Sequence, residues 1–349
     1  MTSLVNTYRG KRVFVGLSGG VDSAVTAHIL RSQGALVTGV FIKGWYPPGM
    51  PCTWAEDRRD AMRVAAHLHI PFYTLDASRE YKESVIEYLI SEYKAGRTPN
   101  PDIMCNRDVK FGAFYSFARS RGADFIATGH YAKQERGALL RGVDTSKDQS
   151  YFLWAISNEA LAHSIFPLGD TQKVDTRAYA LRHHLPVASK KDSQGICFLG
   201  SISVEDFLVE YVGTKQGIAK DITGKEIGTH SGVLLYTLGE KVPLTNAPAG
   251  PWYVQAKDIP RNELTVSHSK YSPQTRENIL LREVNLFRPV SSAEPLTAQY
   301  RYHGPVIEGT FDETTHTFIL SSSVSEPIAS GQSLVIYQGN ECLGGGIIV

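Results

Sequence analysis

The sequence predicts an α/β doubly wound parallel sheet, followed by a small mixed central domain and a C-terminal β-barrel. Short apolar runs alternate with helical stretches over the N-terminal half, and the glycine-rich turn GLSGGVDS joins the first run to the first helix. After about residue 205 helical periodicity gives way to short strand-like runs. Because 349 residues exceed one ordinary domain, we expect three, at 1–205, 206–272 and 273–349.

The N-terminal half contains strands and helices in alternation. The apolar run 12–18 ends in Gly and Ser, which is typical of a buried parallel strand. The further expected strands are 35–43, 71–77 and 123–131, and the expected helices are 21–34, 55–69, 79–93 and 108–122. Parallel neighbours require right-handed crossovers, so this order predicts a single sheet of the doubly wound type.

The C-terminal half has the pattern of β-structure. Residues 217–230 and 249–268 each contain two short runs around a turn, which suggests two hairpins in the central domain. Further short runs indicate successive strands at 296–304, 306–312, 316–322 and 332–339. Several short strands without helical periodicity favour a small barrel or sandwich.

Composition and charge narrow the class of protein. The net charge of +1 gives no bulk support for nucleic-acid binding, although a local basic patch stays possible. No apolar run approaches the roughly 20 residues that span a bilayer, and the N-terminus lacks the apolar core of a secretory signal. We therefore expect a cytoplasmic protein without membrane contact. The cysteines show no CxxC spacing, which argues against structural zinc.

The turn after the first strand is suited to phosphate. Gly19 and Gly20 let phosphate oxygens approach backbone N–H groups, and the next helix contributes the positive end of its dipole. Ser18 and Ser23 add hydroxyl donors, and Asp22 could hold Mg²⁺ between phosphates. The Gly-Lys-Ser/Thr ending of a Walker A loop is absent. The alternative is a plain turn that caps a helix. The expected ATP-binding residues here are Gly16, Leu17, Ser18, Gly19, Gly20, Val21, Asp22 and Ser23.

Two cysteines have unusual surroundings. Cys105 follows a proline-rich loop and precedes a helix that could begin near Asn106, which would lower the pKa of its thiol. Arg107 and Lys110 would strengthen that effect. Cys197 lies near two lysines in KKDSQGICF. The alternative for each is a buried, inert cysteine, which is what we expect of Cys52 and Cys342.

The blocks of the sequence resemble a known family. GLSGGVDS resembles the PP-loop of the N-type ATP pyrophosphatases, adenine nucleotide α-hydrolase-like enzymes that cut ATP between the α- and β-phosphates. This block is followed in order by YKAGRTPNPDIMCN, KFGAF, ATGHYA, LLRGVDTSKDQSYFLW, FPLGD, KKDSQGICF, PWYV and CLGGGII. Together they resemble the MnmA family of tRNA-specific 2-thiouridylases. The resemblance implies ATP-dependent sulfur insertion at C2 of the wobble uridine, position 34 of tRNA.

The resemblance also implies roles for particular residues. Cys105 matches the catalytic nucleophile and Cys197 the persulfide carrier, and the two can form a transient disulfide. Asp102 matches a residue placed against the target base as acid or base. Ile42 and Gly129 belong to the expected ATP site. The expected tRNA contacts are Asn100, Pro101, Asp102, His130, Lys147, Asp148, Gln149, Arg301, Tyr302 and Gln332.

The same resemblance implies binding partners for the protein, and it also shows one segment that differs from the family pattern. The expected substrates are tRNAs for Lys, Glu and Gln, the expected sulfur donor is a cysteine desulfurase or a relay protein, and we expect a monomer. The segment Gly239-Glu240-Lys241 departs from the more basic family stretch, so its contact with tRNA is not carried over. Other PP-loop enzymes, a non-catalytic RNA-binding protein and a nucleotide-sensing regulator remain as alternatives, and the two cysteines favour sulfur chemistry.

Overall fold

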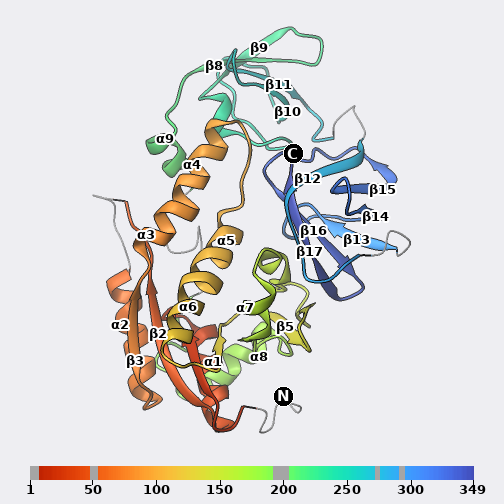
Figure 1. Ribbon diagram of the computed structural model, residues 1–349. Helices are drawn as coiled ribbons and strands as arrows, with labels where there is room; N and C mark the ends of the chain where they lie inside the picture. Colours follow the sequence, from red (N-terminus) through yellow and green to blue (C-terminus); the bar gives the residue numbers. More distant parts are fainter. Residues whose placement is uncertain (1–7, 48–53, 192–203, 272–275, 291–294) are drawn as a thin grey trace. The chain divides into compact units, whose positions relative to one another are not determined.

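A computed structural model describes residues 8–47, 54–191, 204–271, 276–290 and 295–349 (Figure 1). The chain divides into two compact units, each assembled from separate stretches. The first contains Met1–Ile86, Pro101–Ser201 and Tyr337–Gly344. The second contains Glu87–Asn100, Ile202–Ile336 and Gly345–Val349.

The first unit is built on a five-stranded parallel sheet. Its order is β3 (Phe72–Asp76), β2 (Leu36–Lys43), β1 (Arg12–Gly16), β4 (Phe125–Ala127) and β7 (Ser164–Ile165). This confirms the predicted parallel α/β fold and four predicted strands. β7 was not predicted, because two residues are too few to show a period. Strand order reverses beside β1, which is where folds of this type bind ligands.

Apolar side chains cover both faces of this sheet. Val13 and Val15 of β1 are fully buried in a core that also includes apolar residues of α1 (Val21–Ser32) and α2 (Trp54–His67). Phe14 points to the opposite face, where its ring stacks on Tyr73. Successive side chains of β1 thus point to opposite faces of the sheet, and both faces are apolar. A sheet that is apolar on both faces is covered by helices on both sides, as in a doubly wound fold.

The helix that carries Cys105 begins earlier than the sequence predicted. The helical stretch runs from α5 (Pro101–Met104) through the π-helical segment η2 (Cys105–Ala113) to α6 (Phe114–Ser120). The prediction of a start near Asn106 was therefore wrong. A proline is favoured in the first turn of a helix, because its missing N–H needs no partner there. Cys105 consequently lies one turn inside the helix.

The first unit also contains elements that the sequence analysis did not identify. A hairpin joins β5 (Ala132–Glu135) to β6 (Ala138–Arg141) through a turn in which Arg136 and Gly137 have positive φ. β6 pairs with the first residues of β17 (Glu341–Ile348). The remaining helical elements are α3 (Ser78–Tyr81), η1 (Lys82–Ile86), η3 (Ser150–Leu153), α7 (Asn158–Ala162) and α8 (Lys173–Arg182).

The second unit contains a four-stranded sheet of two hairpins. Its order is β10 (Tyr253–Asp258), β11 (Glu263–Ser267), β8 (Gly217–Lys220) and β9 (Glu226–His230). Both hairpins were predicted and are confirmed. Trp252, Val254 and Leu264 are buried in the core of this sheet. The helices α9 (Val204–Tyr211) and η4 (Val233–Leu235) precede and follow β8 and β9 in the chain.

A closed six-stranded barrel completes the fold. Its order is β12 (Arg276–Leu286), β15 (Thr317–Val324), β14 (Val306–Asp312), β13 (Leu296–Gln299), β16 (Ser333–Gln338) and β17, with β12 and β17 also paired. Four of these strands were predicted. β17 was not, because Gly344–Gly346 interrupts the apolar pattern. A Cβ at Gly346 would lie 2.9 Å from Leu281 Cβ, so close strand approach explains that glycine.

The helix α4 (Glu87–Lys94) belongs to the second unit through a cluster of charges. The carboxylate of Glu92 is almost fully buried and accepts hydrogen bonds from Arg97 Nε (2.8 Å) and Arg282 (2.6 Å). Beyond the helix, Thr98 donates its backbone N–H to Ser330 (2.8 Å). These bonds tie residues 87–100 to the barrel. Within the described residues, no helix is both long and apolar enough to cross a bilayer.

Candidate nucleotide site and reactive cysteine

The loop between β1 and α1 packs directly on α2. Gly19 has φ +76°, and a Cβ at this position would lie 2.4 Å from the carbonyl oxygen of Asp57 in α2. Both the left-handed backbone and the close approach require glycine. The loop is therefore fixed from outside as well as by its own hydrogen bonds.

The two serines of the loop fix it to the start of α1. Ser23 Oγ donates to the carbonyl oxygen of Gly20 (3.1 Å) and accepts from the N–H of Ser18 (3.2 Å). The first N–H groups of a helix have no intrahelical acceptor, so the loop presents them together with the positive end of the α1 dipole. This arrangement is suited to phosphate oxygens. ATP contact by Gly16–Ser23 stays a prediction.

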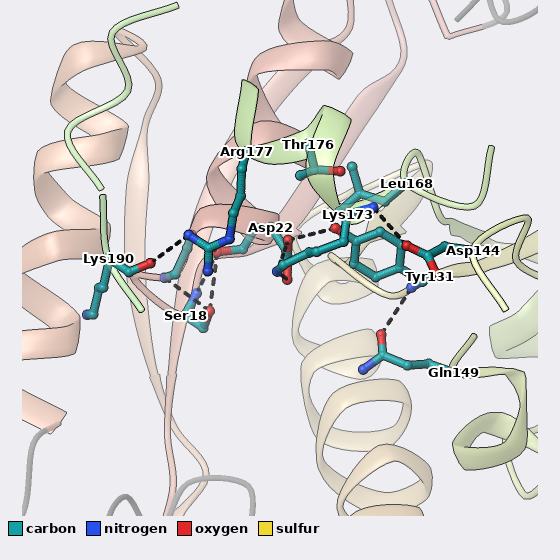
Figure 2. A network of polar contacts seen from close by, with 12 residues as sticks. Ser18, Asp22, Tyr131, Asp144, Gln149, Leu168, Lys173, Thr176, Arg177 and Lys190 are labelled. Atoms are coloured by element: carbon teal, nitrogen blue, oxygen red, sulfur yellow. Dashed lines mark hydrogen bonds and ion pairs between the residues drawn. The ribbon is translucent and has the colours of Figure 1, made fainter. Parts of the chain in front are cut away.

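The carboxylate of Asp22 is held by two side chains (Figure 2). Lys173 Nζ, at the start of α8, lies 2.7 Å from both carboxylate oxygens. The Tyr131 hydroxyl donates to Oδ1 at 2.9 Å. The Lys173 side chain is 13% exposed and that of Asp22 is 31% exposed. A cation and a neutral donor thus meet the acidic residue of the loop in a site that solvent still reaches.

Sequence analysis did not identify Lys173 and Tyr131 as site residues. A lysine as the first residue of a helix is electrostatically unfavourable, because its charge lies at the positive end of the helix dipole. That position was a usable signal that Lys173 has an anionic partner. Tyr131 lies within the ATGHYA block but offered no comparable signal.

One loop positions both partners of Asp22 (Figure 2). Asp144 accepts the backbone N–H of Lys173 at 2.9 Å, and Gln149 Oε1 accepts the backbone N–H of Tyr131 at 3.0 Å. Both acceptors lie between β6 and η3. Their hydrogen bonds fix the backbone from which each donor reaches Asp22.

The segment after β4 lies against the loop. A Cβ at Gly129 would lie 3.0 Å from Asp22 Cβ and from Ser23 N, so Gly129 is adjacent to the predicted ATP site. Ile42 is buried near the carboxyl end of β2, the strand next to β1. His130 is also buried, with Nδ1 2.7 Å from Thr128 Oγ1. Burial and the nearby Lys110 charge lower its pKa well below the usual value, so this imidazole is neutral.

A second group of charges anchors the chain beside Gly19. Lys190 Nζ lies 2.8 Å from a carboxylate oxygen of Asp57 and 2.8 Å from one of Asp60, both in α2. Arg177 of α8 donates to the Lys190 carbonyl oxygen at 3.1 Å (Figure 2). Residue 190 is thereby held next to the nucleotide loop. Cys197 and Cys52 lie outside the described residues.

Cys105 is a fully buried cysteine in the first unit. Asp102, in the same first helical turns, is half-buried. Asn106 donates to the Phe152 carbonyl oxygen at 3.0 Å. Arg107 forms a 3.0 Å ion pair with Asp108. Its guanidinium charge is therefore shared with a carboxylate, and the predicted effect of Arg107 on the thiol is weaker than a free cation would produce.

The predicted RNA contacts of the first unit differ in accessibility. Lys147 is exposed. Asp148 is buried, and its carboxylate accepts from Gly142 N (3.0 Å), Ser150 Oγ (2.9 Å) and Arg141 (3.1 Å). The fold thus uses Asp148 to close this loop.

In the second unit, Arg301 pairs with Glu326 at 2.5 Å, and Gln332 Nε2 donates to the Thr98 carbonyl oxygen at 2.8 Å. The ring of Tyr302 packs against His303, with centroids 4.0 Å apart. Glu240 accepts the N–H of Thr237 at 2.9 Å and so forms a local turn.

The carboxylates of the candidate site show whether it could hold Mg²⁺. Asp22 offers one carboxylate, and no group of three or more His, Cys, Asp or Glu side chains in the described part of the chain could hold a metal. Mg²⁺ commonly takes one or two carboxylates and fills its shell with phosphate oxygens and water. Asp22 fits such an ion when it is bound together with a nucleotide.

Comparison with known proteins covers almost the whole chain. Residues 11–201 match the family model described as tRNA methyl transferase HUP domain, 205–268 its PRC-barrel domain, and 276–348 the aminomethyltransferase beta-barrel domain. Proteins named tRNA-specific 2-thiouridylase MnmA are similar throughout. That of Streptococcus uberis is 41% identical over 97% of this chain and 95% of its own length. That of Pseudomonas aeruginosa is 41% identical over 100% and 97%.

The packing of Gly19 generates a test of the nucleotide site. Gly19→Ala should lose most ATP affinity, at least tenfold, because the new Cβ must push the loop away from α2. The left-handed backbone alone costs a non-glycine residue roughly 1–2 kcal/mol. Gly10→Ala is the matched control, since Gly10 has φ +72° and nothing within 4 Å of a Cβ. Calorimetric titration with ATP compares the two, and equal affinities would contradict a role for this packing.

Proposed function

Because this chain belongs to the MnmA family of tRNA-specific 2-thiouridylases, and is therefore a tRNA sulfurtransferase, we propose that it adenylates C2 of the wobble uridine and replaces its oxygen with persulfide sulfur. The observation that carries the adenylation step is the glycine loop after β1, together with the ion pair between Asp22, at the start of α1, and Lys173, at the start of α8. The product is 2-thiouridine at position 34 of tRNA.

The first step activates a poor leaving group. The C2 oxygen of the base attacks the α-phosphorus of ATP, an O–P bond forms, and the bond to the β-phosphate breaks. Pyrophosphate then carries the developing charge, which the N–H groups of Gly19, Gly20 and the α1 start can stabilise. Lys173 provides a cation within reach of the same place, since it already contacts Asp22.

Asp22 has two partners available in the proposed cycle. Without nucleotide it pairs with Lys173. When a nucleotide is bound, Asp22 would also be the residue to hold Mg²⁺, and the ion would supply charge neutralisation. Lys173, which contacts the same carboxylate, provides a further positive charge for phosphate oxygens. Gln149 and Asp144 keep both donors of Asp22 in position throughout.

The second step exchanges oxygen for sulfur. In one route the terminal sulfur of a Cys197 persulfide attacks C2, AMP leaves, and the Cys105 thiolate then attacks Cys197 Sγ to free the thiolated base. In the other, Cys105 attacks Cys197 Sγ first and releases hydrosulfide, which attacks C2. Both routes end in a Cys105–Cys197 disulfide that a thiol reductant must reduce.

The anchored position of Lys190 supports a meeting of these groups. Cys197 lies seven residues beyond Lys190, so an extended chain reaches at most about 25 Å from that anchor. The anchor itself lies beside Gly19, in the unit that also contains Cys105. The length of chain between Lys190 and Cys197 is therefore compatible with the proposed meeting of Cys197 and the loop.

The proposed tRNA contacts include the residues directly before Cys105, where its helix begins, and side chains of both units. A wobble base lies in a loop and can be splayed into a pocket. Asp102 would meet that base as acid or base. The further contacts proposed are Asn100, Pro101, His130, Lys147, Asp148, Gln149, Arg301, Tyr302 and Gln332. Because His130 and Asp148 are buried, contact with RNA would require them to become exposed.

Partners, location and domains complete the proposal. A cysteine desulfurase, directly or through a relay protein, loads the persulfide, and the substrates are tRNAs for Lys, Glu and Gln. The enzyme acts in the cytoplasm as a monomer. Residues 1–205 form its catalytic domain, 206–272 a tRNA-contacting domain and 273–349 the barrel domain.

The products of ATP test the proposed reaction. With tRNA present, the protein should release AMP and pyrophosphate, and without tRNA it should release neither. Thin-layer chromatography of α-labelled ATP separates AMP from ADP, and γ-labelled ATP reports the pyrophosphate. Release of ADP would contradict adenylation, and mass analysis showing 4-thiouridine or lysidine in place of 2-thiouridine would favour another PP-loop enzyme.

Lys173 generates a second prediction. Lys173→Met should lower the single-turnover rate of AMP formation by about a hundredfold, because a charge that stabilises the transition state is removed. Lys173→Arg should retain part of the rate, since it keeps the charge. Binding of tRNA should be unchanged in both. AMP formation by Lys173→Met at the wild-type rate would show that Lys173 has only a structural role.

Cys105 and Cys342, the two cysteines among the described residues, form a matched pair for testing the sulfur step. Both are fully buried, and burial raises the pKa of the Cys342 thiol to about 12, which makes it unreactive. Cys105→Ser should abolish 2-thiouridine formation, and Cys342→Ser should leave it intact. AMP release by Cys105→Ser should persist in the route in which the persulfide attacks C2 directly, and should stop in the route in which Cys105 first frees hydrosulfide. Nucleoside mass spectrometry measures the product. Normal thiolation by Cys105→Ser would remove this cysteine from the mechanism.

A further inference from the structure

A cavity of about 350 Å³ lies within the second unit. Its walls come from the linker after α4, from β10, from the start of β12 and from residues 326–330. Most of the lining is apolar or uncharged. The charged side chains that line it are Lys257, Arg276 and Glu326.

Lys257 brings a positive charge to this cavity. Its ammonium donates to the carbonyl oxygens of Tyr236 (2.7 Å) and Gly96 (3.0 Å), which are neutral acceptors. Burial lowers the pKa of Lys257 to about 8, although the charge of Glu240 opposes this. Among the described residues, no carboxylate lies within ion-pair distance of Nζ. A largely buried cation that is contacted only by carbonyl oxygens is costly, and an anion in the cavity would offset that cost.

Arg276 adds a second cation at the same cavity. It is the first residue of β12, and its side chain is exposed. Within the described chain it forms no ion pair. An arginine fork can bind two phosphate oxygens at once, which suits it to recognition of a phosphate group.

The carboxylate at this cavity is already neutralised. Glu326 accepts from the hydroxyl of Tyr300 at 2.5 Å and pairs with Arg301 at 2.5 Å. Lys270 Nζ lies 4.0 Å from the same carboxylate. Glu326 therefore does not counter Lys257 or Arg276, and it gathers two further cations next to the cavity.

We propose that this cavity binds a phosphodiester group of the tRNA backbone, with Lys257 inside the cavity and Arg276 at its edge as the phosphate ligands. The inference rests on the proposed function for the identity of the RNA. Tyr271 is 54% exposed beside Lys270, whose Nζ lies 5.2 Å from the ring centroid. Cations interleaved with an exposed aromatic ring suit a nucleic-acid strand, because phosphates pair with the cations and a base stacks on the ring.

The charge can be tested by the salt dependence of tRNA binding. Arg276→Gln should weaken tRNA binding about fivefold, the order of one exposed ion pair. The slope of log Kd against log salt should fall by about 0.7–0.9, the value for one lost phosphate contact. Lys257→Met should act in the same direction. Because Lys257 also holds two carbonyl oxygens, Arg276→Gln keeps the test decisive if Lys257→Met fails to fold.

Two cations of the same unit serve as controls. Arg261 is exposed and pairs with Asp258 at 3.2 Å, and Lys220 pairs with Glu263 at 2.7 Å. Arg261→Gln and Lys220→Met remove the same charge by the same substitution. Both should retain the wild-type slope. An Arg276→Gln slope equal to that of Arg261→Gln would overturn the proposal.

The experiment also separates the possible sources of phosphate. Calorimetry with inorganic phosphate and with AMP should show no difference between wild type and Arg276→Gln. A loss of phosphate or AMP binding with unchanged tRNA affinity would overturn the RNA assignment. Saturating tRNA should restore AMP formation in Arg276→Gln to the wild-type rate. If the wild-type protein binds tRNA but forms no AMP, the proposed reaction is wrong. The phosphate site is then still decided by the salt slopes of Arg276→Gln and Arg261→Gln.

Discussion

The ion pair between Asp22 and Lys173 is the interaction on which the candidate site depends. It joins the first residues of α1 to the first residue of α8, two helices separated by most of the first unit's sequence. Tyr131 adds a hydrogen bond from the segment after β4. Because these three groups start from different strands and helices, Asp22 has both partners only when the sheet is assembled.

The loop between β6 and η3 extends this dependence. Asp148 closes the loop on itself, and Asp144 and Gln149 then hold the backbone of both donors to Asp22. The resemblance to the family places RNA contacts in this loop, and the structure assigns most of its polar groups to internal bonds. Exposed Lys147 is the part of the block that RNA can reach without rearrangement.

Charge is distributed differently in the two units. A net charge of +1 conceals local groups, because Asp57 and Asp60 neutralise Lys190, and Glu92 neutralises two arginines. Lys257 and Arg276 differ, since within the described residues they have no carboxylate partner. Two cations at one cavity with no described carboxylate in ion-pair distance therefore say more about a ligand than the net charge of the chain does.

The sequence alone determined the features that depend on neighbouring residues. The period of the apolar runs predicted the parallel sheet, both central hairpins and four barrel strands, and SGGVDS predicted a phosphate-binding loop between β1 and α1. It also drew attention to Cys105 by its proline-rich context. Only the tertiary structure identified Lys173, 151 residues from Asp22, and Tyr131, 109 residues away. Local patterns report the burial of nearby residues, whereas these partners meet through the order of strands in the sheet. The same reason explains β17 and the buried state of His130, which depend on what packs against them from elsewhere in the chain.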